Sequence, residues 1–164
     1  MATPDSPLQR EIRQARPFRS KAHEATVGLL RTADLVRQGL AKAIAPSGLT
    51  FQQYNVLRIL RGAGAAGLPT LEISDRMIER APGITRLLDR LERKGLVRRE
   101  RCSADRRQVL CWPTVEALAL LAELDSPVDL ADSHAMSALN EEEQSLLVNH
   151  LDTIRLAHLT TSEV

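Results

Sequence analysis

The spacing of apolar residues changes at Gly95, and this change constrains the fold of the 164-residue chain more than any other feature. Before Gly95, apolar residues recur three and four positions apart, which predicts one buried face of a helix. These residues are Ile84, Leu87, Leu88 and Leu91. After Gly95, the stretches 96–101 and 108–112 predict two short strands joined by a polar, basic loop. We therefore expect a helix followed directly by a small β-hairpin.

Pro82 predicts where that helix begins. Proline lacks an amide hydrogen and disfavours helical geometry at Ala81, but it fits the first turn of a new helix. We therefore expect a short helix from Thr70, its predicted N-cap, to about Met77, followed by a tight turn. A second helix is predicted over 82–94, with Gly95 as its left-handed stop.

Amphipathic helices are also predicted on both sides of this region. One spans about 18–45 and stops at Pro46. Another begins at Thr50, whose spacing from Gln53 is that of a capping box, and ends at Gly62.

The last third of the chain predicts two more helices. One opens after Pro113 and is interrupted or kinked at Pro127, and the other is capped by Asn140. Residues 1–17 contain three prolines and are expected to form a flexible basic arm.

Charge is divided unevenly along a chain whose formal net charge is only +1. The net charge is +4 over residues 1–49, +6 over 50–113 and −9 over 114–164. A basic middle beside an acidic tail predicts one surface that faces a polyanion and another that faces away from it.

Two helices joined by a tight turn and followed by a basic hairpin are the parts of a winged helix-turn-helix. The fold class is therefore mainly α with a small β-hairpin. The N-terminal turn of helix 82–94 can enter a major groove, where the donors of Arg86 suit a guanine. The basic hairpin tip suits a narrow minor groove. The predicted DNA-binding residues are Pro82, Gly83, Thr85, Arg86, Arg90, Asp105, Arg106 and Arg107. A solvated strand face remains the alternative for Arg98, Arg99 and Arg101.

Four stretches give the chain a resemblance to the MarR (multiple antibiotic resistance regulator) family of transcription factors. They are 48–57, Ile84-Thr85-Arg86-Leu87-Leu88-Asp89-Arg90-Leu91-Glu92, Lys94-Gly95-Leu96-Val97-Arg98-Arg99 and Asp105-Arg106-Arg107. The resemblance implies a homodimer that places two recognition helices and two wings on a pseudo-palindromic DNA operator. It also implies base reading at Arg86, minor-groove entry at Arg107 and an ion pair of Asp105 that shapes the wing loop. A small aromatic or phenolic inducer would act in a cleft between the dimer helices and the winged domain.

These expectations divide the chain into an arm (1–17), a DNA-binding domain (49–113) and a helical dimerisation region (18–48 with 114–164). Burying the terminal apolar faces against a second copy is economical for so small a core. The predicted dimer contacts are Leu118, Leu121, Leu146, Leu147, Leu151 and Ile154.

The sequence is therefore interpreted as that of a ligand-responsive transcriptional regulator of the repressor type, in the cytoplasm. A winged-helix module that binds protein, or a regulator that senses oxidants through Cys102 or Cys111, is the alternative. No residue pattern predicts an enzyme, a cofactor, a metal site or a membrane span. Phe51 and Tyr54 lie near the implied cleft, but core packing is the simpler interpretation, so no ligand residues are assigned.

Overall fold

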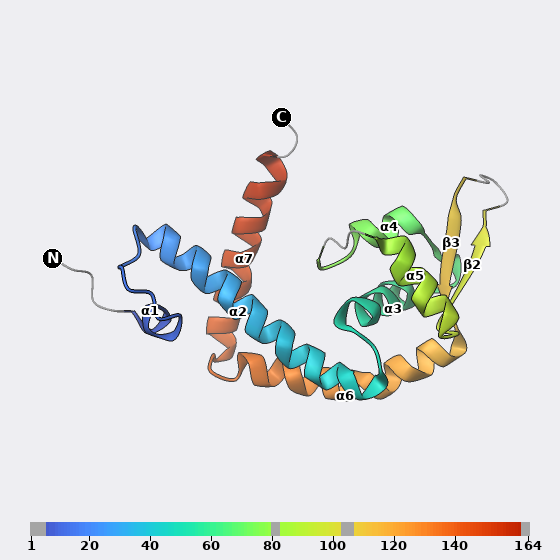
Figure 1. Ribbon diagram of the computed structural model, residues 1–164, viewed down its shortest axis with the longest axis horizontal. Coiled ribbons are helices and arrows are strands. Elements are labelled where there is room, and N and C mark those ends of the chain that lie inside the picture. The colour runs from blue at the N-terminus through green and yellow to red at the C-terminus, as the bar shows by residue number, and fades with distance from the viewer. Residues whose placement is uncertain (1–5, 80–82, 103–106, 162–164) are drawn as a thin grey trace.

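The computed structural model describes residues 6–79, 83–102 and 107–161 and is mainly helical with a small sheet, as predicted (Figure 1). In chain order the elements are α1 (Pro7–Glu11), α2 (Lys21–Ile44), η1 (Ala45–Ser47), α3 (Phe51–Ala63), η2 (Gly64–Ala66), β1 (Leu68–Pro69), α4 (Thr70–Asp75), α5 (Ile84–Arg93), β2 (Val97–Arg101), β3 (Val109–Pro113), α6 (Val115–Met136) and α7 (Glu141–Thr161). No helix within these residues has both the length and the apolar character needed to cross a bilayer.

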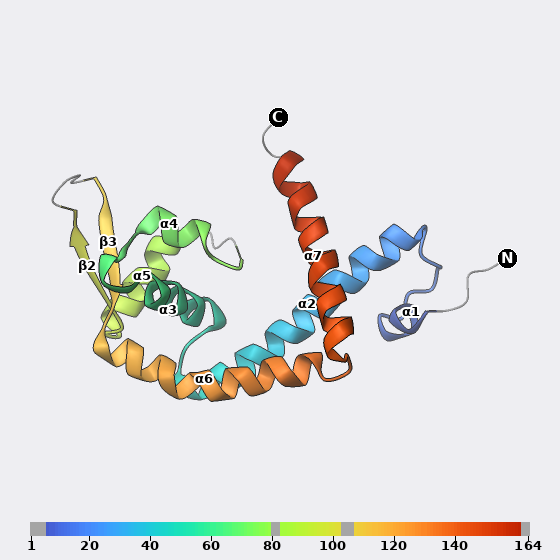
Figure 2. The ribbon, with the colours of Figure 1, turned by 180° about the vertical axis from the view of Figure 1, so that it is seen from behind.

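Two long helices organise the molecule. Figures 1 and 2 show α2 and α6 side by side, with α3, α4, α5 and the sheet gathered at one end and α1 at the other. Helix α7 rises from the far end of α6 and stands away from the sheet in both views. The core therefore lies around α3, at the end of the molecule that carries the sheet.

The core is aliphatic because the chain has only four aromatic residues. Its fully buried large side chains are Ile44, Val56, Leu57, Leu60, Ile73, Leu88, Leu91, Cys111 and Leu121. They come from α2, α3, α4, α5, β3 and α6, so one core joins the long helices to the winged part. Tyr54 is also buried in this core, as its simpler interpretation predicts.

The sheet contains the predicted hairpin and one strand that the sequence did not indicate. Strand order is β1-β3-β2, with both pairs antiparallel. In the hairpin Val97 pairs with Pro113 and Arg101 with Val109. Strand β1 is only two residues long, and periodicity cannot reveal so short a strand.

Three predicted helix ends are confirmed. Thr50 and Gln53 form the reciprocal capping box at the start of α3. Asn140 accepts a bond from the amide of Glu143 before α7. Gly95 follows α5 with a φ of 71°, the left-handed geometry that glycine tolerates best.

Other predicted boundaries are wrong. The helix predicted over 82–94 is observed as Ile84–Arg93, with Gly83 as its N-cap. Helix α3 continues past Gly62 to Ala63. Thr70 is the first residue of α4 and not its N-cap, because its hydroxyl instead lies against β3, 3.5 Å from the carbonyl oxygen of Val109.

Two predictions about prolines also need correction. Helix α6 runs without a break from Val115 to Met136, so the predicted interruption at Pro127 is wrong. The helix packs against α2, and such tertiary contacts can offset the missing backbone donor. Part of the arm is also helical. Ser6 caps α1, Pro7 occupies its first turn, and Glu11 pairs with Arg31 of α2 at 2.8 Å.

Candidate nucleic-acid interface

Helix α5 buries one face and exposes the other. Leu87, Leu88 and Leu91 are buried, and Ile84 is half-buried against the same core. This is the apolar stripe that the sequence predicts. The opposite face is polar and remains available for an external partner.

The predicted contact residues that the structure describes all lie on the surface. Gly83, Thr85, Arg86 and Arg90 are exposed at the start and along the outer face of α5. Within the described part of the chain, neither Arg86 nor Arg90 belongs to an ion pair. Their guanidinium groups can donate to phosphate or to base edges.

The wing extends beside α5 from the same end of the molecule (Figure 1). Arg107 is exposed two residues before the returning strand β3. Three predicted contact residues, Pro82, Asp105 and Arg106, lie outside the described residues. The described part of the site therefore brings together the exposed face of α5 and one side of the wing.

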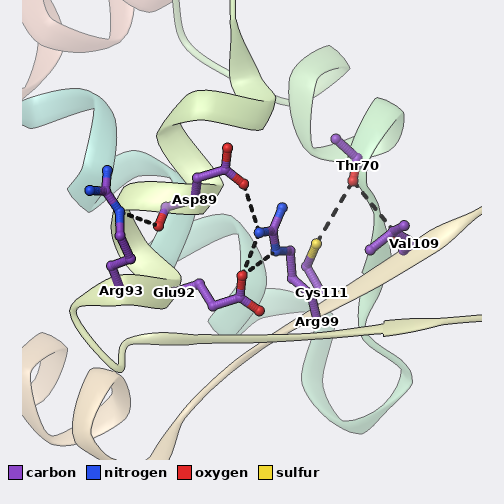
Figure 3. Close-up of polar contacts among 7 residues, drawn as sticks. All are labelled: Thr70, Asp89, Glu92, Arg93, Arg99, Val109 and Cys111. Carbon is purple, nitrogen blue, oxygen red and sulfur yellow. Dashed lines mark hydrogen bonds and ion pairs between the residues drawn. The ribbon is translucent and has the colours of Figure 1, made fainter.

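Arg99 links the wing to α5, although the sequence left it open as part of a solvated face. Its Nε donates to Glu92 at 2.9 Å, and its guanidinium also pairs with Asp89 at 2.7 Å (Figure 3). The Arg99 side chain is only 20% exposed. Strand alternation was the signal that could have found it, because Val97, two residues earlier on the same face, is buried.

The other face of the wing carries a different contact. The Arg98 guanidinium lies 4.4 Å from the ring centre of Trp112, directly across the hairpin. The Trp112 indole donates to the carbonyl of Ala65 at 3.0 Å. This face therefore attaches the wing to η2, the short helix that precedes β1.

A second ion pair joins α3 to α6. Two nitrogens of Arg61 each lie 3.0 Å from a carboxylate oxygen of Asp125, which is a bidentate geometry. The hydrogen bond to Asp125 raises the pKa of Arg61. Burial raises the pKa of nearby Tyr54. The winged part is thus attached to the long helix close to Pro127.

An apolar groove of about 640 Å³ lies between the long helices and the winged part. Phe51 and Ile78 line it on one side and Leu147 and Leu151 on the other. Its charged rim includes Arg37, whose Nε lies 3.5 Å from Glu79. The groove therefore reaches the segment that connects α4 to α5.

The predicted dimer contacts fall into three groups. Leu118, Leu146 and Ile154 are 40%, 57% and 45% exposed, and Leu147 and Leu151 are half-buried. Leu121 is 0% exposed and belongs to the core of its own chain. Its assignment as a dimer contact is therefore wrong, because no surface remains for a second copy.

The two cysteines differ in environment. Both are free thiols, with Cys102 half-buried and Cys111 fully buried. Burial raises the pKa of the Cys111 thiol. Among the described residues, no group of three or more His, Cys, Asp and Glu side chains could hold a metal ion.

Comparison with known proteins agrees with this geometry. The model of the MarR family matches residues 49–109, which contain α3, α4, α5 and β2 and end at the first residue of β3. The transcriptional regulator HosA of Escherichia coli O157:H7 is 33% identical over 100 residues, covering 61% of this chain and 73% of that protein.

Solved structures extend the similarity to the long helices. A MarR transcription factor from Planctomyces limnophilus is 36% identical, with a TM-score of 0.64 over 84% of this chain and 99% of the other. The MepR–DNA complex of S. aureus has a TM-score of 0.72 at 24% identity, over 79% of this chain and 95% of that one, and supports the fold alone.

Proposed function

We propose, because this chain belongs to the MarR family of transcriptional regulators, that it binds double-stranded DNA as a homodimer at a pseudo-palindromic operator. Residues 49–113 would form the DNA-binding domain, and 18–48 with 114–164 the dimerisation region. Gly83, Thr85, Arg86 and Arg90 of α5 would enter the major groove. Arg107, with the neighbouring Asp105 and Arg106, would bring the wing to the minor groove. Pro82 would belong to the same contact.

One observation carries this proposal: α5 buries its leucine face and leaves Arg86 and Arg90 exposed beside the wing. The rigid core behind the helix positions its first turn without using the residues that would touch DNA. A helix presented in this way fits the major groove.

Selection of bound fragments from random duplex DNA tests the proposal, and Arg86→Ala then tests the assigned contact. We expect this variant to weaken operator binding by about 1–3 kcal/mol and to relax specificity at one base position. Arg31→Ala is the matched control, because it removes the same charge from a residue that pairs with Glu11 of α1, and α1 lies at the end of the molecule opposite the sheet (Figure 1). Equal losses in both variants would contradict the role of Arg86.

The exposed apolar side chains of the terminal helices support a homodimer. Leu118, Leu146 and Ile154, with the half-buried Leu147 and Leu151, would meet a second copy. In such a dimer the two α5 helices would reach successive major grooves, about 34 Å apart.

The apolar groove supports regulation by a small aromatic or phenolic ligand. A ligand between Phe51 and Leu151 would also touch Ile78, which lies between α4 and α5 in the chain. It would favour dimers whose recognition helices no longer match the operator. Repeating the DNA selection with and without small aromatic acids tests this regulation, and unchanged operator binding across the panel would count against it.

The proposed activity is that of a cytoplasmic repressor and not of an enzyme. Its rival is a winged-helix module that binds protein. That rival predicts no selected DNA motif and no effect of Arg86→Ala on duplex binding.

A further inference from the structure

A single row of residues crosses the small sheet at the base of the wing. Arg99 on β2 pairs with Cys111 on β3, which pairs with Leu68 on β1. Directly paired residues in an antiparallel sheet project from the same face. Since Cys111 and Leu68 are buried, this face is turned toward the helices.

Each strand of the hairpin contacts a different helix from this row. The Cys111 sulfur lies 3.9 Å from the Thr70 hydroxyl at the start of α4. Arg99 reaches α5, where it contacts the carboxylates of both Asp89 and Glu92 (Figure 3). The Arg99 contact is much the stronger, because it is charged on both sides and uses two nitrogens of one guanidinium.

The two acids are placed to receive one guanidinium. Asp89 and Glu92 are three residues apart on α5, so they project from the same side of the helix. Their hydrogen bonds raise the pKa of Arg99, with the bond to Glu92 contributing most. These acids otherwise place negative charge on a helix that is proposed to approach DNA.

We propose that Arg99 is a positioning residue, which sets the wing against α5 through Glu92 and Asp89 so that both can grip one duplex together. The inference rests on the proposed function. Arg99 need not touch DNA, because its fork of donors is already directed at the two carboxylates. Arg99 instead fixes the distance between α5 and the wing, so less conformational entropy is lost when both of them bind the duplex.

Glu92→Gln gives the sharpest test, because two explanations predict opposite signs. If only charge mattered, removing an acid beside DNA would tighten binding. If Glu92 holds the wing through Arg99, operator binding should weaken, by about tenfold. Glu100→Gln is the matched control, since it also removes an acid, but one that pairs with Arg98 of its own strand β2. It should bind at least as tightly as the unchanged protein.

Variants of the arginine itself complete the test. Arg99→Gln should weaken operator binding about as much as Glu92→Gln. Arg99→Lys should restore only part of the lost affinity, because lysine lacks the planar fork of donors. Arg98→Gln removes the same charge from the other face of the sheet and should cost less.

Coupling to the wing distinguishes positioning from a general loss of structure. In an Arg107→Gln background, Glu92→Gln should have little further effect on operator binding, because the wing contact is already impaired. A general structural defect would persist in that background. In the protein without DNA, amide hydrogen exchange across β2 and β3 should quicken in Arg99→Gln and Glu92→Gln but not in Arg98→Gln.

The outcomes separate the two proposals. Glu92→Gln that binds as tightly as the unchanged protein, or an effect that persists fully beside Arg107→Gln, overturns the positioning role while leaving DNA binding intact. An unchanged protein that binds no duplex overturns the proposed function. The hydrogen-exchange comparison still decides whether Arg99 holds the wing.

Discussion

At the scale of single residues, Gly67 shows how little space the wing base allows. Its φ is 67°, and a Cβ placed on it would overlap Cε2 of Trp112. An L side chain there meets both backbone strain and the indole that anchors the wing to the preceding loop.

Gly67→Ala should therefore lower the free energy of unfolding by about 1–3 kcal/mol, and more if Trp112 cannot move. Gly62→Ala is the matched control, because that glycine lies in α3 with open space around a new Cβ. The control should stabilise the chain by roughly 0.5–1 kcal/mol. Urea denaturation measures both, and a similar change in the two variants would contradict this account.

The thiols provide a second prediction at this scale. Iodoacetamide at pH 8 should label Cys102 well before Cys111, because Cys111 is fully buried and its raised pKa keeps the thiol neutral. Mass spectrometry of the labelled peptides reads the difference, and denaturant should remove it. Equal labelling of the folded chain would show that the wing base opens freely.

The same shift has a consequence for stability. The pKa of Cys111 is raised above its ordinary value of 9.0, so the folded chain holds the thiol proton more tightly than the unfolded chain does. The contribution of the Cys111 thiol to the free energy of unfolding is therefore present below about pH 9 and is lost as the pH rises beyond that value.

At the scale of elements, the start of α3 depends on a reciprocal pair of hydrogen bonds. The Thr50 hydroxyl accepts from the Gln53 amide at 3.2 Å, and the Gln53 side chain accepts from the Thr50 amide at 3.1 Å. Helix α3 lies at the centre of the core, so fraying at this end would disturb the packing of both the long helices and α5.

Thr50→Ala should lower the free energy of unfolding by about 1 kcal/mol, because it removes the hydroxyl that accepts from the Gln53 backbone amide, while the bond from the residue-50 amide to the Gln53 side chain remains possible. Thr26→Ala, on the exposed surface of α2, makes the same chemical change and should cost less than about 0.5 kcal/mol. Thermal or urea unfolding followed by circular dichroism compares them. Equal costs would mean that the capping box contributes nothing beyond ordinary loss of a threonine.

At the scale of the whole molecule, the long helices expose apolar side chains that the single chain does not cover. The chain should sediment as a dimer. Leu146→Asp combined with Ile154→Asp should give monomers, because each places a charge in the proposed interface. Leu71→Asp changes an even more exposed leucine, on α4, and should leave the dimer intact. Dimers that persist in the double variant would move the interface elsewhere.

Salt dependence belongs to the same scale, because the slope of affinity against salt concentration is proportional to the number of phosphates that the whole dimer neutralises. Operator affinity should fall at least about a hundredfold between 50 and 200 mM salt, as expected for four or more phosphate contacts. Fluorescence anisotropy with labelled duplex measures it. An affinity that stays constant over this range would exclude an electrostatic interface.

Local chemistry by itself determined the elements of this protein. The spacing of Leu87, Leu88 and Leu91, the capping box at Thr50 and the left-handed stop at Gly95 depend on residues a few positions apart. These features were therefore predictable, and together they indicated a winged helix-turn-helix.

Only the tertiary structure decided what each surface residue contacts. Leu121, which was predicted to lie in an interface, is buried in the core, and α6 is continuous through Pro127. Arg99 contacts Asp89 and Glu92. The reason is physical: periodicity tells which face of an element is buried, but the partner of that face depends on segments that approach from elsewhere in the chain. Arg98 and Arg99 are neighbours in the sequence, yet one lies over an indole and the other holds the wing against α5.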